Sequence, residues 1–174
     1  TKDMDLCADF IAQSRATWRI LRNSVRIGFS VGEETITDIN LLTLQNKHPR
    51  EIITYKCPKH LEAQLGADWK WFFLSASKIL TFRFQAKKLN VNGCNYPELD
   101  YRGKSGQRQI DLLIDRSSNG YLREIPLYIF YNYWPRGKFK PSWNCQTLKK
   151  NPSMLGCGVA YAKSIRDILN GGSN

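Results

Sequence analysis

The sequence predicts an α/β fold in which a mixed β-sheet is flanked by helices. Residues 79–87 alternate apolar and polar side chains, which is typical of a strand with one buried face. Residues 125–133 form a near-continuous apolar run, which suits a central strand covered on both faces. Between them, residues 106–116 carry apolar side chains at helical spacing. A helix between two strands predicts a right-handed parallel connection, and therefore a sheet that mixes parallel and antiparallel pairs.

Two helices are expected before the sheet. Over residues 5–25, apolar side chains recur at helical intervals with arginines interleaved, so this stretch is predicted to form the first helix. A glycine-containing stretch, 28–32, then breaks the pattern. Residues 33–45 are predicted to form the second helix, because acidic residues stand in its first turn, where the helix dipole favours negative charge.

The remaining elements complete a core of helix, three strands, helix and strand. A short strand is expected around residues 52–55, followed by an aromatic-rich strand over 67–73, both ahead of the strand at 79–87. A closing helix is expected over 159–169. The chain of 174 residues is long enough for one domain and too short for two full-sized ones. Its expected parts are an N-terminal helix (1–30), a catalytic core (31–133), and a basic loop with a C-terminal helix (134–174).

The charge balance predicts a polyanionic partner. Twenty-six Lys and Arg residues against fifteen Asp and Glu leave a net charge of +11, and nucleic acid is the commonest partner of such a surface. A composition of 42% hydrophobic and 24% charged residues excludes a disordered or fibrous chain. No apolar run approaches the roughly 18 residues of a membrane helix, so no membrane partner is expected. Five widely spaced cysteines without a CxxC pair exclude a disulfide framework and favour the cytoplasm.

Polar side chains at matching ends of these elements are candidates for chemistry. Asp68 opens one predicted strand, and Gln85 and Lys87 lie two residues apart on the next, so they project from the same face. If the two strands form a hairpin, the start of the first lies beside the end of the second. Asp68 is then expected to neighbour Gln85 and Lys87.

The second predicted helix adds further carboxylates. Glu34 and Asp38 are one turn apart, and Leu41, a further turn along, predicts that this face points inwards. Carboxylate and amide oxygens are hard ligands suited to Mg²⁺ or Mn²⁺. Such a metal can lower the pKa of a bound water and offset charge on a phosphodiester. Lys87 is then available to orient that water or to stabilise the developing charge.

The order of Glu34 on a helix, Asp68 at a strand start and Gln85-Ala86-Lys87 on the next strand resembles the PD-(D/E)xK nuclease superfamily, which has a restriction-endonuclease-like fold. The chain is more narrowly similar to an uncharacterised bacterial family assigned to that superfamily, over about residues 32–133. The segments that carry this narrower similarity are GEETITD (32–38), GADW (66–69) and YIFYN (128–132).

The resemblance implies a metal-dependent endonuclease that acts on nucleic acid, with DNA favoured over RNA, and a role in bacterial defence. It implies Glu34, Asp68 and Gln85 as ligands of Mg²⁺ or Mn²⁺, and Lys87 as the catalytic lysine. Cutting both strands would favour a homodimer. The chain departs from the superfamily at Gln85, where the usual residue is an acid. Some restriction-type members, including those that act on modified DNA, resemble this glutamine form, and a neutral ligand should hold the metal more weakly.

A basic and aromatic segment follows the last predicted strand. Residues 134–150 contain lysines, an arginine and aromatic rings but no acid, the combination that single strands and backbone-tracking loops use. The alternative is an ordinary basic loop whose aromatic side chains lie in the core. The expected nucleic-acid contacts are Lys88, Arg136, Lys138, Lys140 and Trp143.

Three other interpretations remain open at this level. Residues 28–32 (GFSVG) match the GxSxG nucleophile elbow of hydrolases, but that motif follows a strand and needs a later histidine, whereas His48 and His60 are the only histidines and come too soon. A glycine-rich hinge is therefore expected there. A non-catalytic nucleic-acid-binding module of the same fold is the main alternative to the nuclease. A scaffold that binds a protein partner through exposed aromatic side chains is the third class.

Overall fold

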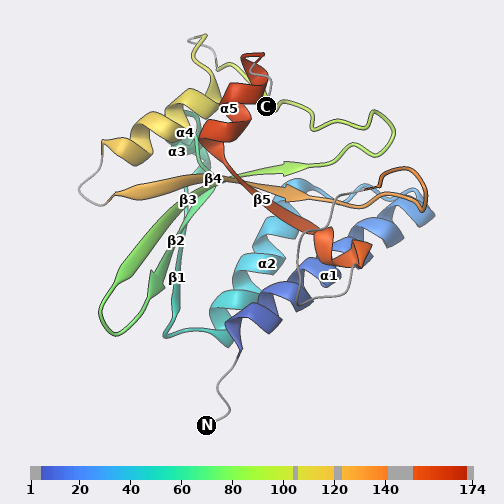
Figure 1. Cartoon of the computed structure of the whole chain (residues 1–174), viewed down its shortest axis with the longest axis horizontal. Coiled ribbons are helices and arrows are strands. Elements are labelled where there is room, and N and C mark those ends of the chain that lie inside the picture. Colours follow the sequence, from blue (N-terminus) through green and yellow to red (C-terminus); the bar gives the residue numbers. More distant parts are fainter. Residues whose placement is uncertain (1–4, 104–105, 120–122, 141–150, 172–174) are drawn as a thin grey trace.

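The structure is a computed structural model that describes residues 5–103, 106–119, 123–140 and 151–171. Its centre is a single five-stranded sheet with helices on both faces (Figure 1). The strands, in their order across the sheet, are β1 (Ile52–Lys56), β2 (Trp69–Leu74), β3 (Ile79–Lys88), β4 (Glu124–Tyr131) and β5 (Cys157–Tyr161). The helices are α1 (Leu6–Ile27), α2 (Glu33–Lys47), α3 (Lys59–Leu65), α4 (Gln109–Ser118) and α5 (Ala162–Leu169), with a short 3₁₀ helix, η1 (Pro152–Leu155).

The sheet is mixed, as the sequence predicts. β1, β2 and β3 pair in an antiparallel fashion, β3 pairs with β4 in parallel, and β4 pairs with β5 in an antiparallel fashion. The parallel pair is joined through α4, which is the helical crossover expected between residues 87 and 125. The prediction of an α/β fold with a mixed sheet flanked by helices is therefore confirmed.

Two elements differ from the expectation. The seven-residue helix α3 lies between β1 and β2, where no helix was expected. Residues 157–161 form strand β5, although a closing helix was predicted from residue 159, and that helix begins only at Ala162. The reason is tertiary, because β5 is held by pairing with β4, which lies some thirty residues earlier, as in the pair Leu127↔Tyr161. Local periodicity carries no signal for such a partner.

Each face of the sheet has its own hydrophobic core. On one face α1 and α2 cover side chains of the strands, including Trp69, Phe84 and Leu127. On the other, α4 and α5 pack on Tyr128 and Phe130. Successive residues of a strand point to opposite faces of the sheet. Every residue from 83 to 87 of β3 is nevertheless buried, because helices cover both faces. The expectation that the alternating strand has one exposed face is wrong, since helices cover both.

The second face of β3 carries polar side chains that need partners. The exposed fraction of Arg83 is only 4%, and its Nε atom donates to the Glu124 carboxylate at 2.5 Å. Lys70 on β2 donates to the other oxygen of Glu124 at 2.6 Å. This buried triad pairs the charges in the middle of the face, which matters because a charge taken out of water is costly unless it is paired. Gln85 and Lys87, at the end of the same face, lie outside the triad.

The GxSxG match at residues 28–32 does not form a nucleophile elbow. These residues link α1 to α2, so a helix rather than a strand precedes Ser30, which is exposed. His48 is buried and contacts Asp9 through Nε2 at 3.0 Å. Among the described residues no disulfide is formed by Cys7, Cys57, Cys94 or Cys157, and no helix is long and apolar enough to cross a membrane.

Gly66 leads the chain from α3 to the start of β2 and leaves no room for an added methyl group. Its φ angle is +64°, and a Cβ would lie 2.7 Å from the backbone nitrogen of Leu113 and 2.8 Å from the carbonyl oxygen of Gln109. Gly28 has a φ angle of +67° with nothing within 4 Å, so it is a matched control. We expect Gly28→Ala to cost roughly 1–2 kcal/mol of unfolding free energy through backbone strain alone. Gly66→Ala is expected to cost about 1–3 kcal/mol more through overpacking. Urea unfolding measures both, and equal costs would refute the close approach of α4.

Candidate functional site

The β2–β3 hairpin brings Asp68 to Gln85, as the sequence predicts. The backbone nitrogen of Asp68 donates to the carbonyl of Phe84 at 2.8 Å, which extends the strand pairing by one residue. The Asp68 carboxylate accepts from Gln85 Nε2 at 3.0 and 2.9 Å, and its Oδ2 atom accepts from the backbone nitrogen of Ala86 at 2.7 Å. Three hydrogen bonds, two from Gln85 Nε2 and one from the backbone nitrogen of Ala86, therefore fix the Asp68 carboxylate on β3.

Lys87 lies on the same face of β3 as Gln85. The two residues pair with Phe130 and Tyr128 of β4, whose side chains belong to the core under α4 and α5. Lys87 is 6% exposed. Within the described part of the chain, no hydrogen bond or ion pair is found for its amino group. Burial raises the pKa values of the Asp68 and Glu33 carboxyls, and the positive charge of Lys87 opposes that rise.

The acid that α2 brings to this cluster is Glu33 rather than Glu34. Burial raises the pKa of the Glu33 carboxyl to about 7, with Lys87 opposing the rise and Asp68 adding to it. The Glu34 side chain is 50% exposed, and its carboxylate lies 3.0 Å from Lys59 Nζ and 3.8 Å from Lys56 Nζ. The geometry therefore gives Glu34 a place at the rim of the cluster, not within it.

The expectation that Glu34 and Asp38 lie on the inward face of α2 is wrong. Asp38 is exposed and bonds to Lys56. The buried residues of α2 are Ile36, Thr37, Asn40, Leu41 and Leu44, which follow the helical period of 3.6 residues. Extending that series back by one turn reaches Glu33. The apolar spacing of Ile36, Leu41 and Leu44 is thus the sequence signal that identifies Glu33.

A hydroxyl chain fixes the first turn of α2 against the sheet. Thr37 Oγ1 donates to the carbonyl oxygen of Glu33 at 3.0 Å and lies 2.9 Å from the hydroxyl of Tyr131 on β4. Both Thr37 and Tyr131 are buried. Neither was identified from the sequence as a positioning residue. Their contact holds the first turn of α2, which carries Glu33, against the sheet near the end of β3, where Lys87 lies.

Burial also perturbs the second carboxylate of the cluster. It raises the pKa of Asp68 to about 6, although the hydrogen bond from Ala86 and the charge of Lys87 act in the opposite direction. The carboxylate opens onto a groove of about 450 Å³ between α2, α3 and β1. The groove is lined by Gly32, Glu33, Glu34, Thr37, Lys56, Lys59, Glu62 and Asp68.

The chemistry of the donor set fits a hard divalent cation only if the glutamine takes part. Among the described residues, no three His, Cys, Asp or Glu side chains come together as metal ligands. Glu33 and Asp68 supply carboxylate oxygens, so Gln85 is the remaining oxygen donor of the cluster. Its Oε1 atom is buried without a hydrogen-bond partner in the described residues. An unsatisfied buried acceptor of this kind fits a cation ligand.

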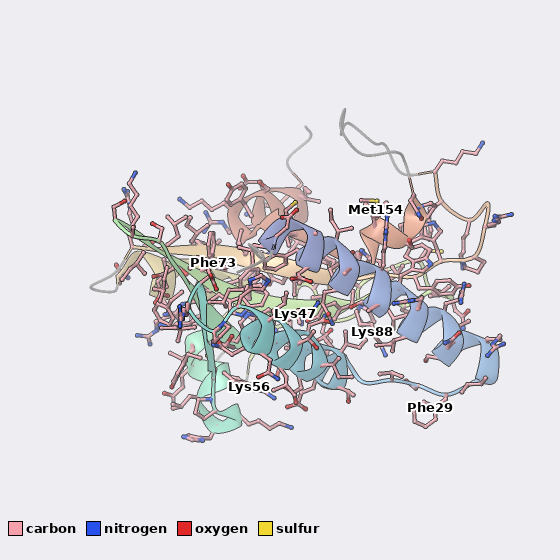
Figure 2. All side chains as sticks on the ribbon, turned by 90° about the horizontal axis from the view of Figure 1, so that it is seen from below. Phe29, Lys47, Lys56, Phe73, Lys88 and Met154 are labelled. Atoms are coloured by element: carbon pink, nitrogen blue, oxygen red, sulfur yellow. The ribbon has the colours of Figure 1, made fainter. Side chains whose placement is uncertain are left out.

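The expected nucleic-acid contacts are scattered around the cluster. Figure 2 shows Lys88, whose Nζ donates to the carbonyl of Val31 at 2.5 Å, on the side of the sheet that α1 and α2 cover. Lys138 donates to the carbonyl of Val91, while Arg136 and Lys140 are exposed. Trp143 lies outside the described residues.

The fold and site define an α/β protein with a buried cluster of two acids, an amide and a lysine at one edge of its sheet. The chain belongs to a family of unknown function, DUF6615, whose model matches residues 6–173. No curated protein matches the sequence. The family therefore assigns no activity, and the function has to be argued from the cluster itself.

The raised pKa of Glu33 predicts a stability cost that depends on pH. The folded protein holds this proton up to about pH 7, whereas the ordinary pKa of a glutamate side chain is 4.5. The cost is therefore absent below pH 4.5, grows through the interval from 4.5 to 7, and is complete above it. In the presence of a chelator, Glu33→Gln is expected to stabilise the protein at pH 8 by on the order of 1 kcal/mol, after discounting for partial exposure, and not at pH 4.5.

Glu34→Gln is the matched control for this comparison. Because Glu34 is half-exposed and paired only with surface lysines, its replacement should change stability by less than about 1 kcal/mol at either pH. Thermal unfolding at the two pH values measures both differences. A Glu33→Gln variant whose advantage is the same at pH 4.5 and pH 8 would contradict the placement of Glu33 inside the cluster.

Proposed function

We propose that this protein is a metal-dependent nuclease that hydrolyses phosphodiester bonds in nucleic acid, with DNA as the favoured substrate. The observation that carries the proposal is the convergence of Glu33, Asp68, Gln85 and Lys87 from three separate elements at one edge of the sheet. The order of a helical acid, a strand acid and a QxK strand resembles the PD-(D/E)xK superfamily. Cytoplasmic localisation, bacterial defence and a homodimer that cuts both strands belong to the same proposal.

Asp68, Gln85 and Glu33 would hold the Mg²⁺ or Mn²⁺ ion. Gln85 presents an N–H donor to Asp68 and leaves Oε1 without a partner in the described residues. Its role as a ligand would be carried by that amide oxygen. When bound, the metal supplies a water of lowered pKa and offsets charge on the phosphodiester.

Lys87 supplies charge to the site. It is a buried cation beside two acids, so its amino group can stabilise the negative charge that develops on the phosphate. Burial raises the pKa of Glu33, and a bound cation would offset this cost by favouring the ionised carboxylate. The clamp of Asp68 by Ala86 and Gln85 keeps the strand acid in one position. This rigidity is the preorganisation that favours a transition state over free substrate.

A non-catalytic nucleic-acid-binding module is the second candidate. One observation favours it, since Gln85 Nε2 already donates to both oxygens of Asp68 and so satisfies that pair without a cation. Cleavage of supercoiled plasmid and of RNA, with Mg²⁺, Mn²⁺ or a chelator, separates the two candidates. Metal-dependent nicking supports the nuclease, and binding without cleavage under every condition supports the module.

Lys87→Ala is expected to reduce cleavage about 100-fold or more, the scale on which losing a charge-stabilising donor acts. Nucleic-acid affinity and melting temperature should stay near those of the wild type, because Lys87 makes no hydrogen bond within the described residues. Lys78→Ala, at the exposed turn before β3, is the control and should cleave normally. A Lys87→Ala protein that cuts at the normal rate would remove the nuclease assignment.

Gln85→Glu tests the ligand role of the glutamine. Without metal, the variant loses two N–H donors to Asp68 and sets two carboxylates together, so the melting temperature should fall, with a cost on the order of 1–3 kcal/mol. With Mn²⁺, the added charge should tighten metal binding and raise the melting temperature by more than in the wild type. Calorimetric titration with Mn²⁺ measures the affinity directly. A destabilised variant with no gain in Mn²⁺ affinity would favour a structural role for Gln85.

A further inference from the structure

We propose that the exposed face of α1 binds the phosphate backbone of DNA through Arg15, Arg19, Arg22 and Arg26, here called the arginine row. None of these four side chains belongs to the catalytic cluster. The inference deepens the proposed nuclease function, on which it rests for the identity of the polyanion. It assigns a substrate-holding surface that is separate from the residues that cut.

The four arginines form one line along the helix. Their spacing of four, three and four residues keeps them within an arc of about 60°, given about 3.6 residues per turn. All four are exposed, and they lie opposite the face that α1 buries. The buried residues of that face are Gln13, Ser14, Thr17, Trp18 and Leu21. At about 1.5 Å per residue the row is about 16 Å long, which matches about five phosphates of one strand at about 3.4 Å each.

The row is not explained by intramolecular pairing. The sequence has no acidic residue from position 10 to position 32. Within the described residues, none of the four arginines forms a salt bridge. Like charges three or four residues apart destabilise a helix, so the row works against the stability of α1. Arg26 stands in the last turn, where the helix dipole favours a cation, but the other three lie outside that turn.

A second basic segment packs against α1. Trp18, on the buried face of α1, makes edge contacts with Tyr133 and Trp134, with ring centroids 5.2 and 4.8 Å apart. The segment that continues from these aromatics carries the exposed side chains of Arg136 and Lys140. A groove of about 420 Å³ is lined by Arg22, Asn23, Val25, Arg26 and Tyr133. The start of the second segment thus meets the end of the arginine row at this groove.

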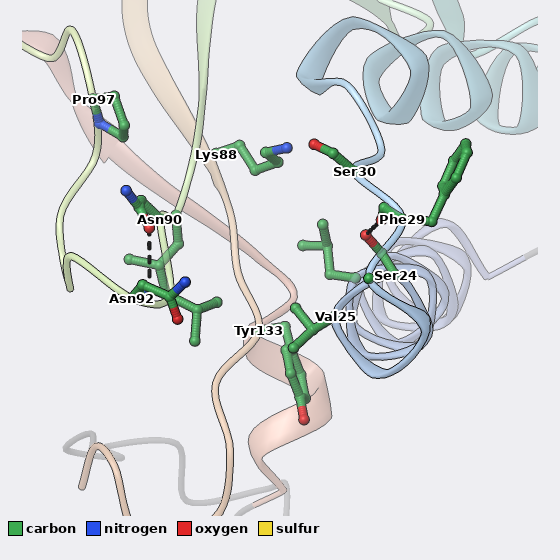
Figure 3. A pocket seen from close by; sticks show the side chains of 13 residues that line it. Ser24, Val25, Phe29, Ser30, Lys88, Asn90, Asn92, Pro97 and Tyr133 are labelled. Atoms are coloured by element: carbon green, nitrogen blue, oxygen red, sulfur yellow. Dashed lines mark hydrogen bonds between the residues drawn. The ribbon is translucent and has the colours of Figure 1, made fainter.

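The arginine row leads to the catalytic cluster. α1 ends at Gly28, and the next four residues connect it to Glu33. A groove of about 500 Å³ lies at this end of α1, between Val25 and the loop at Asn90 and Asn92, with Lys88 between them (Figure 3). The row therefore ends beside the segment that leads into Glu33, the acid that α2 brings to the cluster.

A lipid surface fits this helix less well than a nucleic acid does. A helix that lies on a membrane inserts its apolar face, but the apolar face of α1 is occupied by the core of this protein. In the described part of the chain, the large apolar side chains exposed near the row lie at its end, at Val25, Ile27 and Phe29. The geometry therefore points to regularly spaced phosphates as the occupant.

The test compares two variants of equal net charge. One replaces the four arginines of the row by glutamine, and the control replaces four exposed cations elsewhere, Lys78, Arg116, Arg123 and Lys163, by glutamine. Both carry the Lys87→Ala change and are assayed in chelator, so binding is measured independently of cleavage. The probes are a DNA duplex of 30 base pairs and vesicles containing phosphatidylserine. Melting temperatures establish that both variants are folded.

We expect the row variant to bind the duplex more weakly, with the slope of log K against log salt smaller by up to about 3.6, or about 0.9 for each lost phosphate contact. The control should keep nearly the wild-type slope. Equal losses in both variants, or an unchanged slope in the row variant, would overturn the proposal. It would also be overturned if only vesicle binding depended on the row. Because no arm requires cleavage, a protein that binds through the row but never cuts would refute the nuclease and leave this surface in place.

Discussion

The constraint on which the structure depends is that β3 is buried on both faces although one face is polar. The apolar face of β3 packs under α1 and α2, and helices on the other side cover Arg83, Gln85 and Lys87. Water cannot satisfy these groups, so other strands must. Glu124 pairs with Arg83, and Asp68 accepts from Gln85. One of the acids that stabilise the polar face, Asp68, is therefore also a member of the candidate site.

The same face shows where stability and function separate. The triad of Lys70, Arg83 and Glu124 is closed, because each charge has a partner within it. The cluster at the sheet edge is open, because burial raises the pKa of both Glu33 and Asp68 and leaves Gln85 Oε1 without a partner in the described residues. Such unrelieved desolvation is characteristic of functional sites, which give up stability to hold groups ready for a ligand.

Under the proposed function, the sheet edge and the outer surface of α1 have different roles. The sheet edge, with the first turn of α2 fixed by Thr37 and Tyr131, holds the groups that can do chemistry. The outer surface of α1 and the segment after β4 hold positive charge, and the packing of Trp18 on Trp134 brings them together. The net charge of +11 is thus more than a general property of the surface. Part of it lies in the arginine row on the exposed face of α1.

The sequence by itself determined what depends on short-range regularity. The alternation in residues 79–87, the helix that follows it and the apolar run near residue 128 were enough to predict the parallel connection, and a short hairpin was enough to set Asp68 beside Gln85. Only the tertiary structure decided that both faces of β3 are covered and that residues 157–161 are a strand. The physical reason is the same in each case. Burial and strand pairing are set by partners distant along the chain. A local pattern shows the spacing of its apolar residues but not which other element will cover them.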